Sequence, residues 1–269
     1  MTPFCAGREI APGVHLIALL ARSHHLDVYD AWSDQRVCRV VVKTPRPDRL
    51  REPAARTDLL REGRLLRRLA HPHIVRAYGV HDGPRPAIVL ETLGGETLAH
   101  LLRRRRRRLA APEVAHLGTH VASALSYLHA EGVLHLDVKP SNIVADGGRA
   151  KLIDLSIARP PGRMRAGRGT WCNMAPEQAR GGIIGPPADV WGLGTVLYEA
   201  ATGTNPFDEI DCGDDEYPQL LHRAAPVRSL RRLPAPLTAV IDGCLEPAAP
   251  DRPRLDEALA TLGEVAASC

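Results

Sequence analysis

The sequence predicts an α+β fold with two lobes: a small N-terminal lobe built on an antiparallel sheet with one helix, and a larger, mainly helical C-terminal lobe. Short apolar segments separated by turns fill about the first ninety residues, whereas stretches with apolar side chains at helical spacing fill the remainder. The glycine pair Gly94-Gly95 lies where this character changes. We therefore expect one domain whose lobes are residues 1–92 and 93–269.

Three segments of the first lobe have the composition of β-strands, and one segment has that of a helix. The expected strands are residues 14–20, 36–43 and 87–90. The expected helix runs from about residue 58 to residue 69, where Leu59, Leu66 and Leu69 lie on or near one face. This arrangement predicts a small sheet interrupted by a single helix.

Three amphipathic helices are expected in the second lobe. The first opens at Pro112, whose fixed φ suits the first turn of a helix, and closes at Gly132. The second begins at Asp189, interpreted as its N-cap, and runs toward Gly203. The third covers residues 256–259 near the end of the chain.

The composition is that of an ordinary globular protein of 269 residues, with 44% hydrophobic and 25% charged residues. The six cysteines form no Cys-x-x-Cys pair, so we expect reduced thiols and neither a zinc site nor a disulfide framework. We expect no transmembrane segment, signal peptide, sensor domain or membrane anchor, and therefore a cytoplasmic protein. A formal net charge of +4 is too small to predict nucleic-acid binding.

The most unusual charge pattern is an uninterrupted run of six arginines, from Arg103 to Arg108. Such a run is most simply a solvated helix end. The alternative is a docking patch for an acidic partner or a membrane surface.

The segment 133–144 carries three polar residues whose order suggests phosphoryl transfer. Asp137 can orient an attacking hydroxyl, and Lys139, two residues later, can place a cation on the transferred group. Asn142 offers a neutral oxygen and Asp154 an anionic one, and each is flanked by apolar residues typical of short buried strands. Oxygen ligands of this kind suit Mg²⁺, so we expect these two residues to bind the metal.

With these motifs in place, the chain resembles a bacterial-type serine/threonine protein kinase over nearly its whole length. Val40-Val41-Val42-Lys43 resembles the strand whose lysine binds the α- and β-phosphates of ATP, and Glu62 lies where the helix glutamate that pairs with it belongs. The resemblance also implies a nucleotide site at Ala21, Ser23 and Val28, and adenine contacts from the backbone of Glu91 and Leu93. ATP and Mg²⁺ are therefore the expected cofactors.

The second lobe contains further signatures in the family order. Residues 169–177 resemble the end of an activation segment, with Thr170 near the substrate hydroxyl. The resemblance implies that Glu177 pairs with Arg252 and that Asp189 anchors the catalytic loop. It implies a protein substrate and favours serine or threonine over tyrosine.

The chain departs from the family at its glycine-rich loop, whose three glycine positions carry Ala21, Ser23 and Leu26. A Cβ atom obstructs both unusual dihedrals and close approach to a phosphate, so we expect the nucleotide to be held loosely. The usual Asp-Phe-Gly is Asp154-Leu155-Ser156, which keeps the carboxylate but restricts flipping of the segment.

A second departure concerns activation. Leu136 replaces the arginine that in many relatives receives a phosphate on the activation loop, and Ser156 is the only hydroxyl residue between Leu155 and Gly169. We therefore expect no phosphorylation switch in this loop. The loop is instead basic, and its arginines are either merely solvated or attract an acidic substrate or partner; they are Arg159, Arg163, Arg165 and Arg168.

Three hypotheses follow for the function. The first is ATP- and Mg²⁺-dependent phosphoryl transfer to Ser or Thr of a protein, with Asp137 and Lys139 as the catalytic residues. The second is a pseudokinase that binds a nucleotide or a partner without turnover, as the degenerate glycine loop suggests. The third, a small-molecule phosphotransferase, fits less well because residues 170–177 resemble a platform for an extended peptide.

Overall fold

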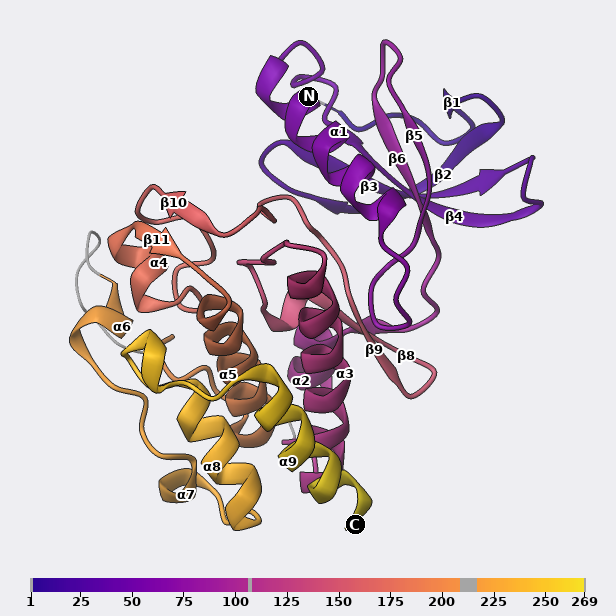
Figure 1. Ribbon diagram of the computed structural model, residues 1–269. Coiled ribbons are helices and arrows are strands. Elements are labelled where there is room, and N and C mark those ends of the chain that lie inside the picture. Colours follow the sequence, from indigo (N-terminus) through magenta and orange to yellow (C-terminus); the bar gives the residue numbers. More distant parts are fainter. Residues whose placement is uncertain (1, 106–107, 209–216, 269) are drawn as a thin grey trace. The chain divides into compact units, whose positions relative to one another are not determined.

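A computed structural model describes residues 2–105, 108–208 and 217–268. The chain forms two compact units, and the first consists of residues 1–94 together with Asp154–Ser156. The second consists of Gly95–Ile153 and Ile157–Cys269. The first unit is an antiparallel sheet with one long helix and the second is mainly helical, which confirms the predicted α+β fold (Figure 1).

The first unit is built on a six-stranded antiparallel sheet with the strand order β1-β2-β3-β4-β6-β5. Neighbouring strands are mostly consecutive in sequence because short turns connect them. The helix α1, Pro53–Arg68, lies between β4 and β5 in sequence. The strands are β1 (Glu9–Ala11), β2 (Val14–Arg22), β3 (Leu26–Ser33), β4 (Cys38–Pro45), β5 (Ala77–His81) and β6 (Ala87–Glu91).

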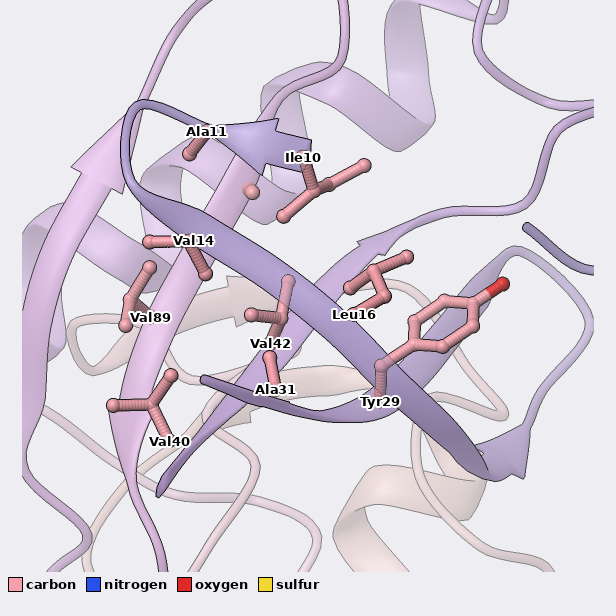
Figure 2. Close-up of a cluster of buried hydrophobic side chains, with 10 residues drawn as sticks. Ile10, Ala11, Val14, Leu16, Tyr29, Ala31, Val40, Val42 and Val89 are labelled. Atoms are coloured by element: carbon pink, nitrogen blue, oxygen red, sulfur yellow. The ribbon is translucent and has the colours of Figure 1, made fainter. Parts of the chain in front are cut away.

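One face of this sheet carries the aliphatic core of the unit. Val40 and Val42 of β4 point to this face and pack with Ala31 and Tyr29 of β3 (Figure 2). Side chains alternate along a strand, so Val41 and Lys43 project from the opposite face. The sheet thus separates an apolar core from the face that carries the lysine.

Helix α1 packs against the face that carries Lys43. Ile88 is paired with Lys43 in the sheet, and a Cβ atom on Gly63 of α1 would lie only 3.0 Å from Ile88 Cγ1 and 2.8 Å from Val80 Cγ2. Such a distance requires the neighbour to move, so the missing side chain of Gly63 permits the close approach of helix and sheet. Glu62, the preceding residue, is thereby brought to the lysine.

The second unit is organised around helices α3 and α5, which pack against each other and against α9 and α8, respectively (Figure 1). Gly118 of α3 allows this packing, because a Cβ there would lie 2.8 Å from Leu262 of α9. The helices are α2 (Leu98–Arg105), α3 (Ala111–Ala130), α4 (Pro176–Arg180), α5 (Pro187–Thr202), α6 (Pro218–Leu221), α7 (Val227–Leu230), α8 (Ala235–Cys244) and α9 (Leu255–Ala267), with the 3₁₀ turns η1 (Pro140–Asn142) and η2 (Ala249–Asp251).

Two small sheets complete this unit. The strands β7, β8 and β9 form one antiparallel sheet, and β10 pairs with β11 in the other. Gly95, next to β7, must be a glycine because a Cβ there would lie 1.6 Å from the carbonyl oxygen of Ala145. The strands are β7 (Glu96–Thr97), β8 (Ile143–Asp146), β9 (Arg149–Leu152), β10 (Gly162–Met164) and β11 (Gly182–Ile184).

Several expected boundaries were wrong. The strand expected at residue 36 begins at Cys38, because the preceding turn contains Val37 in a left-handed conformation with φ of 52°. Helix α1 begins at Pro53, well before residue 58, since proline is accommodated in the first turn. Asp189 is not an N-cap: helix α5 begins at Pro187, and the Asp189 side chain accepts hydrogen bonds from elsewhere.

The arginine run lies only partly within the described residues, since Arg106 and Arg107 fall outside them. Arg104 forms an ion pair with Glu96, and Arg108 donates to the carbonyl of Leu230. The docking patch at Arg103–Arg108 stays a prediction. Among the described residues, no helix has the length and apolar character needed to cross a bilayer.

Candidate active site

The first unit contains a cluster of three charged side chains, of which Lys43 and Glu62 are buried. Lys43 Nζ donates to both carboxylate oxygens of Glu62, at 2.9 and 2.8 Å, and to Asp154 Oδ1 at 3.0 Å. Lys43 and Glu62 are 7% and 2% exposed. Breaking this pair would leave an uncompensated buried charge, so the three side chains hold one another in place.

The pKa values follow from burial and from the opposed charges. Burial alone would lower the pKa of Lys43, but Glu62 and Asp154 outweigh it and hold that pKa above its ordinary value. Burial opposes ionisation of Asp154, yet Lys43 and the Ser156 hydrogen bonds hold the pKa of Asp154 well below its usual range. The lysine is therefore a fixed cation and Asp154 a fixed anion at neutral pH.

The segment Asp154–Ser156 is tied to helix α1. The backbone N–H of Leu155 donates to Glu62 Oε1 at 3.1 Å, and Arg61 donates to the carbonyl oxygen of Ser156 at 2.6 Å. Asp154 has a φ of 67°, a left-handed conformation that is uncommon for a residue with a side chain. The surrounding hydrogen bonds hold this residue, including one from the Ser156 N–H to Asp154 Oδ1 at 3.1 Å.

The predicted catalytic loop, residues 133–144, takes part in a separate polar network of the second unit. The Thr170 hydroxyl donates to Asp137 Oδ1 at 2.7 Å and accepts from Lys139 Nζ at 2.6 Å. Asp137 Oδ2 lies 2.8 Å from Lys139 Nζ and accepts from Asn142 Nδ2 at 3.0 Å. Asp137, Lys139, Asn142 and Thr170, separated by up to 33 residues, thus form one connected group.

Asp189 anchors the backbone of this loop. Its carboxylate is fully buried and accepts from the N–H groups of His135 and Leu136, at 2.8 and 2.7 Å, while His129 Nε2 lies 2.7 Å away. Leu136 has a φ of 65°, so the loop turns sharply where the carboxylate holds it. Gly192, one turn further along α5, lets the helix approach, because a Cβ there would lie 2.8 Å from Val138 Cβ.

The activation segment is held by two further side chains. Gln178 is buried, and its amide nitrogen donates to the carbonyl oxygens of Leu136 and Arg168, both at 2.9 Å. Glu177 pairs with Arg252 through two hydrogen bonds of 2.7 and 2.9 Å. A bidentate pair of this kind fixes orientation as well as distance.

The turn at the glycine-loop position is closed by its own residues. Ser23 donates from its backbone to the Leu26 carbonyl at 2.8 Å, and its hydroxyl accepts from the Leu26 N–H at 3.0 Å. Ala21 and Ser23 are exposed, and none of the described residues from 21 to 26 has a positive φ. The turn therefore folds without glycine. Its side chains occupy space that glycine residues would leave open to a phosphate.

The remaining predicted nucleotide residues belong to the same unit as Lys43. Val28 is paired with Lys43 across β3 and β4, which places both on one face of the sheet. Glu91 ends β6, and its N–H donates to the carbonyl of Arg76 at 2.9 Å. Leu93 follows in the irregular segment after β6 and is half-buried.

The two expected metal ligands each retain a suitable oxygen. Asn142 uses its Nδ2 for Asp137, which leaves its Oδ1 as an acceptor, and Asp154 engages Lys43 and Ser156 through Oδ1 alone among the described contacts. Free carboxylate and amide oxygens are ligands that Mg²⁺ accepts. The donor chemistry therefore fits the expected ion, although the two side chains belong to different units.

The sequence analysis missed three residues that position the site: Gly63, Gln178 and Gly192. Gly63 and Gly192 permit close approach of a helix, and Gln178 joins two loops. A helical glycine that lies one residue after a candidate glutamate was a usable signal, because glycine is disfavoured in helices without a packing reason. Nothing in the local sequence marks Gln178.

A sheet-rich unit with a Lys–Glu–Asp cluster, followed by a helical unit with an Asp–Lys–Asn loop, has the residue types that kinases use for phosphoryl transfer. Residues 25–262 match the protein kinase domain, so the chain belongs to the protein kinase family. Members of this family use ATP and a divalent metal.

Curated relatives include bacterial serine/threonine kinases, which confirms the resemblance drawn from the sequence. Serine/threonine-protein kinase PkaA of Streptomyces coelicolor is 36% identical over 219 residues, covering 77% of this chain and 39% of the relative. Serine/threonine-protein kinase PknH of Mycobacterium tuberculosis is 34% identical over 201 residues, covering 72% and 32%. CBL-interacting protein kinase 4 of rice, Oryza sativa subsp. japonica, is 37% identical over 166 residues, covering 58% and 37%. The matches thus span between 32% and 39% of the length of these relatives.

Proposed function

We propose that this chain transfers the γ-phosphoryl group of ATP to serine or threonine hydroxyls of proteins, with Mg²⁺ and without a phosphorylation switch in its activation segment. The observation that carries the proposal is the network of Asp137, Lys139, Asn142 and Thr170. A scaffold without turnover has no need to hold a carboxylate and a cation in hydrogen-bonding distance of one hydroxyl, with an amide bound to the same carboxylate.

The polar groups of the site have distinct roles in phosphoryl transfer. Asp137 orients the substrate hydroxyl and accepts its proton as the oxygen attacks the γ-phosphorus, while the bond to the leaving ADP breaks. Lys139 stabilises the negative charge of the transferring group, and Lys43, held by Glu62, positions the nucleotide phosphates. Asn142 and Asp154 would hold Mg²⁺, which neutralises phosphate charge when bound.

The absence of a phosphorylation switch is supported by what occupies the receiver position. Leu136 is 2% exposed and its side chain carries no charge, so it cannot form an ion pair with a phosphate. The segment is instead ordered by pairing of β10 with β11 and by Gln178. These contacts need no modification, and we propose that the active arrangement of the loop is permanent.

The pseudokinase hypothesis is favoured by one observation, the closed β2–β3 turn that lacks glycine. The two hypotheses differ in a measurable way. A pseudokinase retains the Asp137 network yet transfers phosphate no faster than a variant without the carboxylate.

The test is transfer of labelled phosphate from ATP to a serine and threonine peptide library, comparing wild type with Asp137→Asn. Loss of the base is expected to lower the rate by about 10²–10⁴-fold. Asp256→Asn is the matched control, because Asp256 is exposed and forms an ion pair with Arg254 at the start of α9. Equal rates for wild type and Asp137→Asn would refute the enzyme proposal, and transfer to metabolites but to no peptide would point to a small-molecule phosphotransferase.

A further inference from the structure

We propose that the activation segment selects substrates that carry anionic side chains near the phosphorylated residue, and that Arg163, Arg165 and Arg168 bind them. This inference rests on the proposed function, because it names the substrate class of the same site. Its basis is the position, exposure and rigid support of these three arginines.

Arg163 and Arg165 lie on and next to a short strand that orients them. Arg163 is in β10, where it pairs with Ile183 of β11, and Met164 beside it is buried. Because side chains alternate along a strand, Arg163 and Arg165 project away from the buried Met164 side. Both are exposed, so the ribbon presents two guanidinium groups to solvent (Figure 1 shows β10 and β11 side by side).

The backbone beneath these arginines is closely packed. Gly181 has a φ of 75°, and a Cβ on it would lie 2.7 Å from Ala166 N and 3.3 Å from the carbonyl carbon of Arg165. The N–H of Gly167 donates to the Gln178 carbonyl at 3.0 Å. The basic segment is therefore held against α4 and β11, which limits the ordering entropy that binding would cost.

Arg168 connects this segment to the catalytic loop. The Gln178 amide binds the carbonyl oxygens of Arg168 and Leu136 at equal distances of 2.9 Å, and Leu136 directly precedes Asp137. Arg168 is also two residues from Thr170, whose hydroxyl contacts both Asp137 and Lys139. When the hydroxyl of a peptide lies at Asp137, we therefore expect the residues that flank this hydroxyl to lie within reach of the Arg168 side chain.

The charge of the three arginines is not balanced by described carboxylates. Arg163, Arg165 and Arg168 form no ion pair with another described residue, and Arg159 donates to the carbonyl oxygen of Arg163. The nearest acidic side chains in sequence are committed elsewhere, since Asp154 pairs with Lys43 and Glu177 pairs with Arg252. Clustered like charges repel one another, and an anionic ligand relieves this repulsion.

Carboxylates and phosphates share the chemistry that guanidinium groups recognise. The anion on the substrate is thus an Asp or Glu side chain, or a residue that another kinase has already phosphorylated. The two sources are separated by peptides of otherwise identical sequence.

The experiment compares kcat/KM for serine peptides flanked by alanine, glutamate, phosphoserine or lysine, at low and high ionic strength. We expect an anionic peptide to be preferred over the alanine peptide by about tenfold at low salt, with the preference fading as salt screens the charges. Preference for phosphoserine alone would identify a primed substrate, and preference for both anions a general acidic one. Equal kcat/KM for all four peptides would overturn the inference.

The residue assignment is tested by Arg163→Ala, Arg165→Ala and Arg168→Ala, singly and together. The readout is the ratio of the anionic to the alanine peptide, because a merely structural defect lowers both rates and leaves the ratio unchanged. Arg228→Ala is the matched control, an exposed arginine on α7 of the same unit. We expect the ratio to fall to about one in the triple variant and to persist in the control. A ratio that survives in the triple variant would refute the assignment.

A binding measurement keeps this inference separate from the proposed function. Fluorescence anisotropy of the labelled glutamate and alanine peptides reports affinity without turnover. If no peptide is phosphorylated but the glutamate peptide binds more tightly and loses this advantage in the triple variant, the proposed function fails and the inference holds. If the alanine peptide is phosphorylated while both peptides bind equally, the inference fails and the proposed function holds.

Discussion

The catalytic loop and the β2–β3 turn are both short connections expected near the transferred phosphates, yet different interactions hold them. The loop is fixed by buried side chains from distant parts of the chain, Asp189 and Gln178, which bind its backbone amides and a carbonyl. The turn is closed by exposed local contacts, chiefly those between Ser23 and Leu26. Arg46 adds longer hydrogen bonds of 3.4 and 3.3 Å to the turn.

This difference explains which features of the family the chain retains. A substitution in the loop network leaves a buried polar group without a partner, which costs about 1–3 kcal/mol. A substitution at the tip of an exposed turn usually changes stability by less than about 0.5 kcal/mol. Glycines of the turn can therefore be replaced without unfolding the protein. A single substitution in the network of the catalytic loop, by contrast, destabilises it.

The strongest test of this comparison is Lys43→Met, which removes the cation of the buried cluster. Glu62 and Asp154 then face each other without compensation, so we expect the free energy of unfolding to fall by about 3–5 kcal/mol and phosphate transfer by at least about 10²-fold. Denaturant unfolding and the peptide assay measure the two effects.

The double variant Lys43→Met with Glu62→Gln separates stability from activity. Neutralising Glu62 is expected to restore part of the lost stability, because the uncompensated carboxylate is gone, while transfer stays low. Recovery of transfer together with stability would show that Lys43 acts only as a structural cation.

The second test is Asp189→Asn, directed at the anchor of the catalytic loop. An amide offers one acceptor oxygen where the carboxylate serves His129 and two backbone N–H groups, so one contact is lost. We expect about 2–3 kcal/mol of destabilisation by denaturant unfolding and a fall in kcat with little change in the KM for ATP. A rise in the KM for ATP with unchanged kcat would contradict an anchoring role limited to this loop.

Residues with local signals were the part of the site that the sequence could predict. The Asp137 loop was predicted because short spacings mark it, whereas Lys43 and Glu62 were predicted from the resemblance to the kinase family; the structure brings Lys43 to Glu62 and Asp137 to Lys139. Gly63 was missed although a glycine inside a helical pattern is a usable signal, whereas Gln178 acts through tertiary contacts, which single-sequence patterns do not report. The N-cap assigned to Asp189 was wrong for the same reason, since its buried carboxylate binds the backbone of another segment.

A third, smaller effect comes from the base of the β2–β3 turn. Asp27 is buried and accepts from Arg22 at 2.7 and 2.8 Å and from the Tyr29 hydroxyl at 2.9 Å. Burial and the Asp27 hydrogen bond raise the pKa of Tyr29 to about 12, although the Phe4 amide and Arg22 oppose this. Folding therefore favours the neutral phenol.

The raised pKa of Tyr29 makes the folded protein less stable at high pH. Above about pH 10 an unfolded tyrosine releases its proton while folded Tyr29 keeps it, so stability is present below pH 10 and is lost as pH rises through about 12. Between about pH 9 and about pH 11.5, wild type should lose on the order of 1–2 kcal/mol more than Tyr29→Phe in denaturant unfolding. Parallel losses in the two proteins would show that Tyr29 does not titrate in this range.

The smallest effect is expected from replacing Ala21, Ser23 and Leu26 by glycine. This variant tests whether the β2–β3 turn limits the rate of phosphate transfer. The three Cβ atoms are removed and the Ser23–Leu26 contacts go with them, so the turn gains freedom to approach a phosphate. We expect ATP with Mg²⁺ to bind about fivefold more tightly by calorimetry, with a loss of stability below about 0.5 kcal/mol for each substitution in this exposed turn.

The matched control for this variant is Ala18→Gly, an exposed position on the same strand that shares the backbone effect but lies away from the turn. If the glycine variant binds ATP more tightly and also raises kcat/KM for the peptide, the catalytic loop was already competent and the turn limited the rate. If it binds more tightly but transfers no faster, nucleotide affinity was not limiting. Unchanged or weaker binding would mean that the turn is already adapted to the nucleotide without glycine, because its residues keep ordinary φ values and close the loop through their own hydrogen bonds.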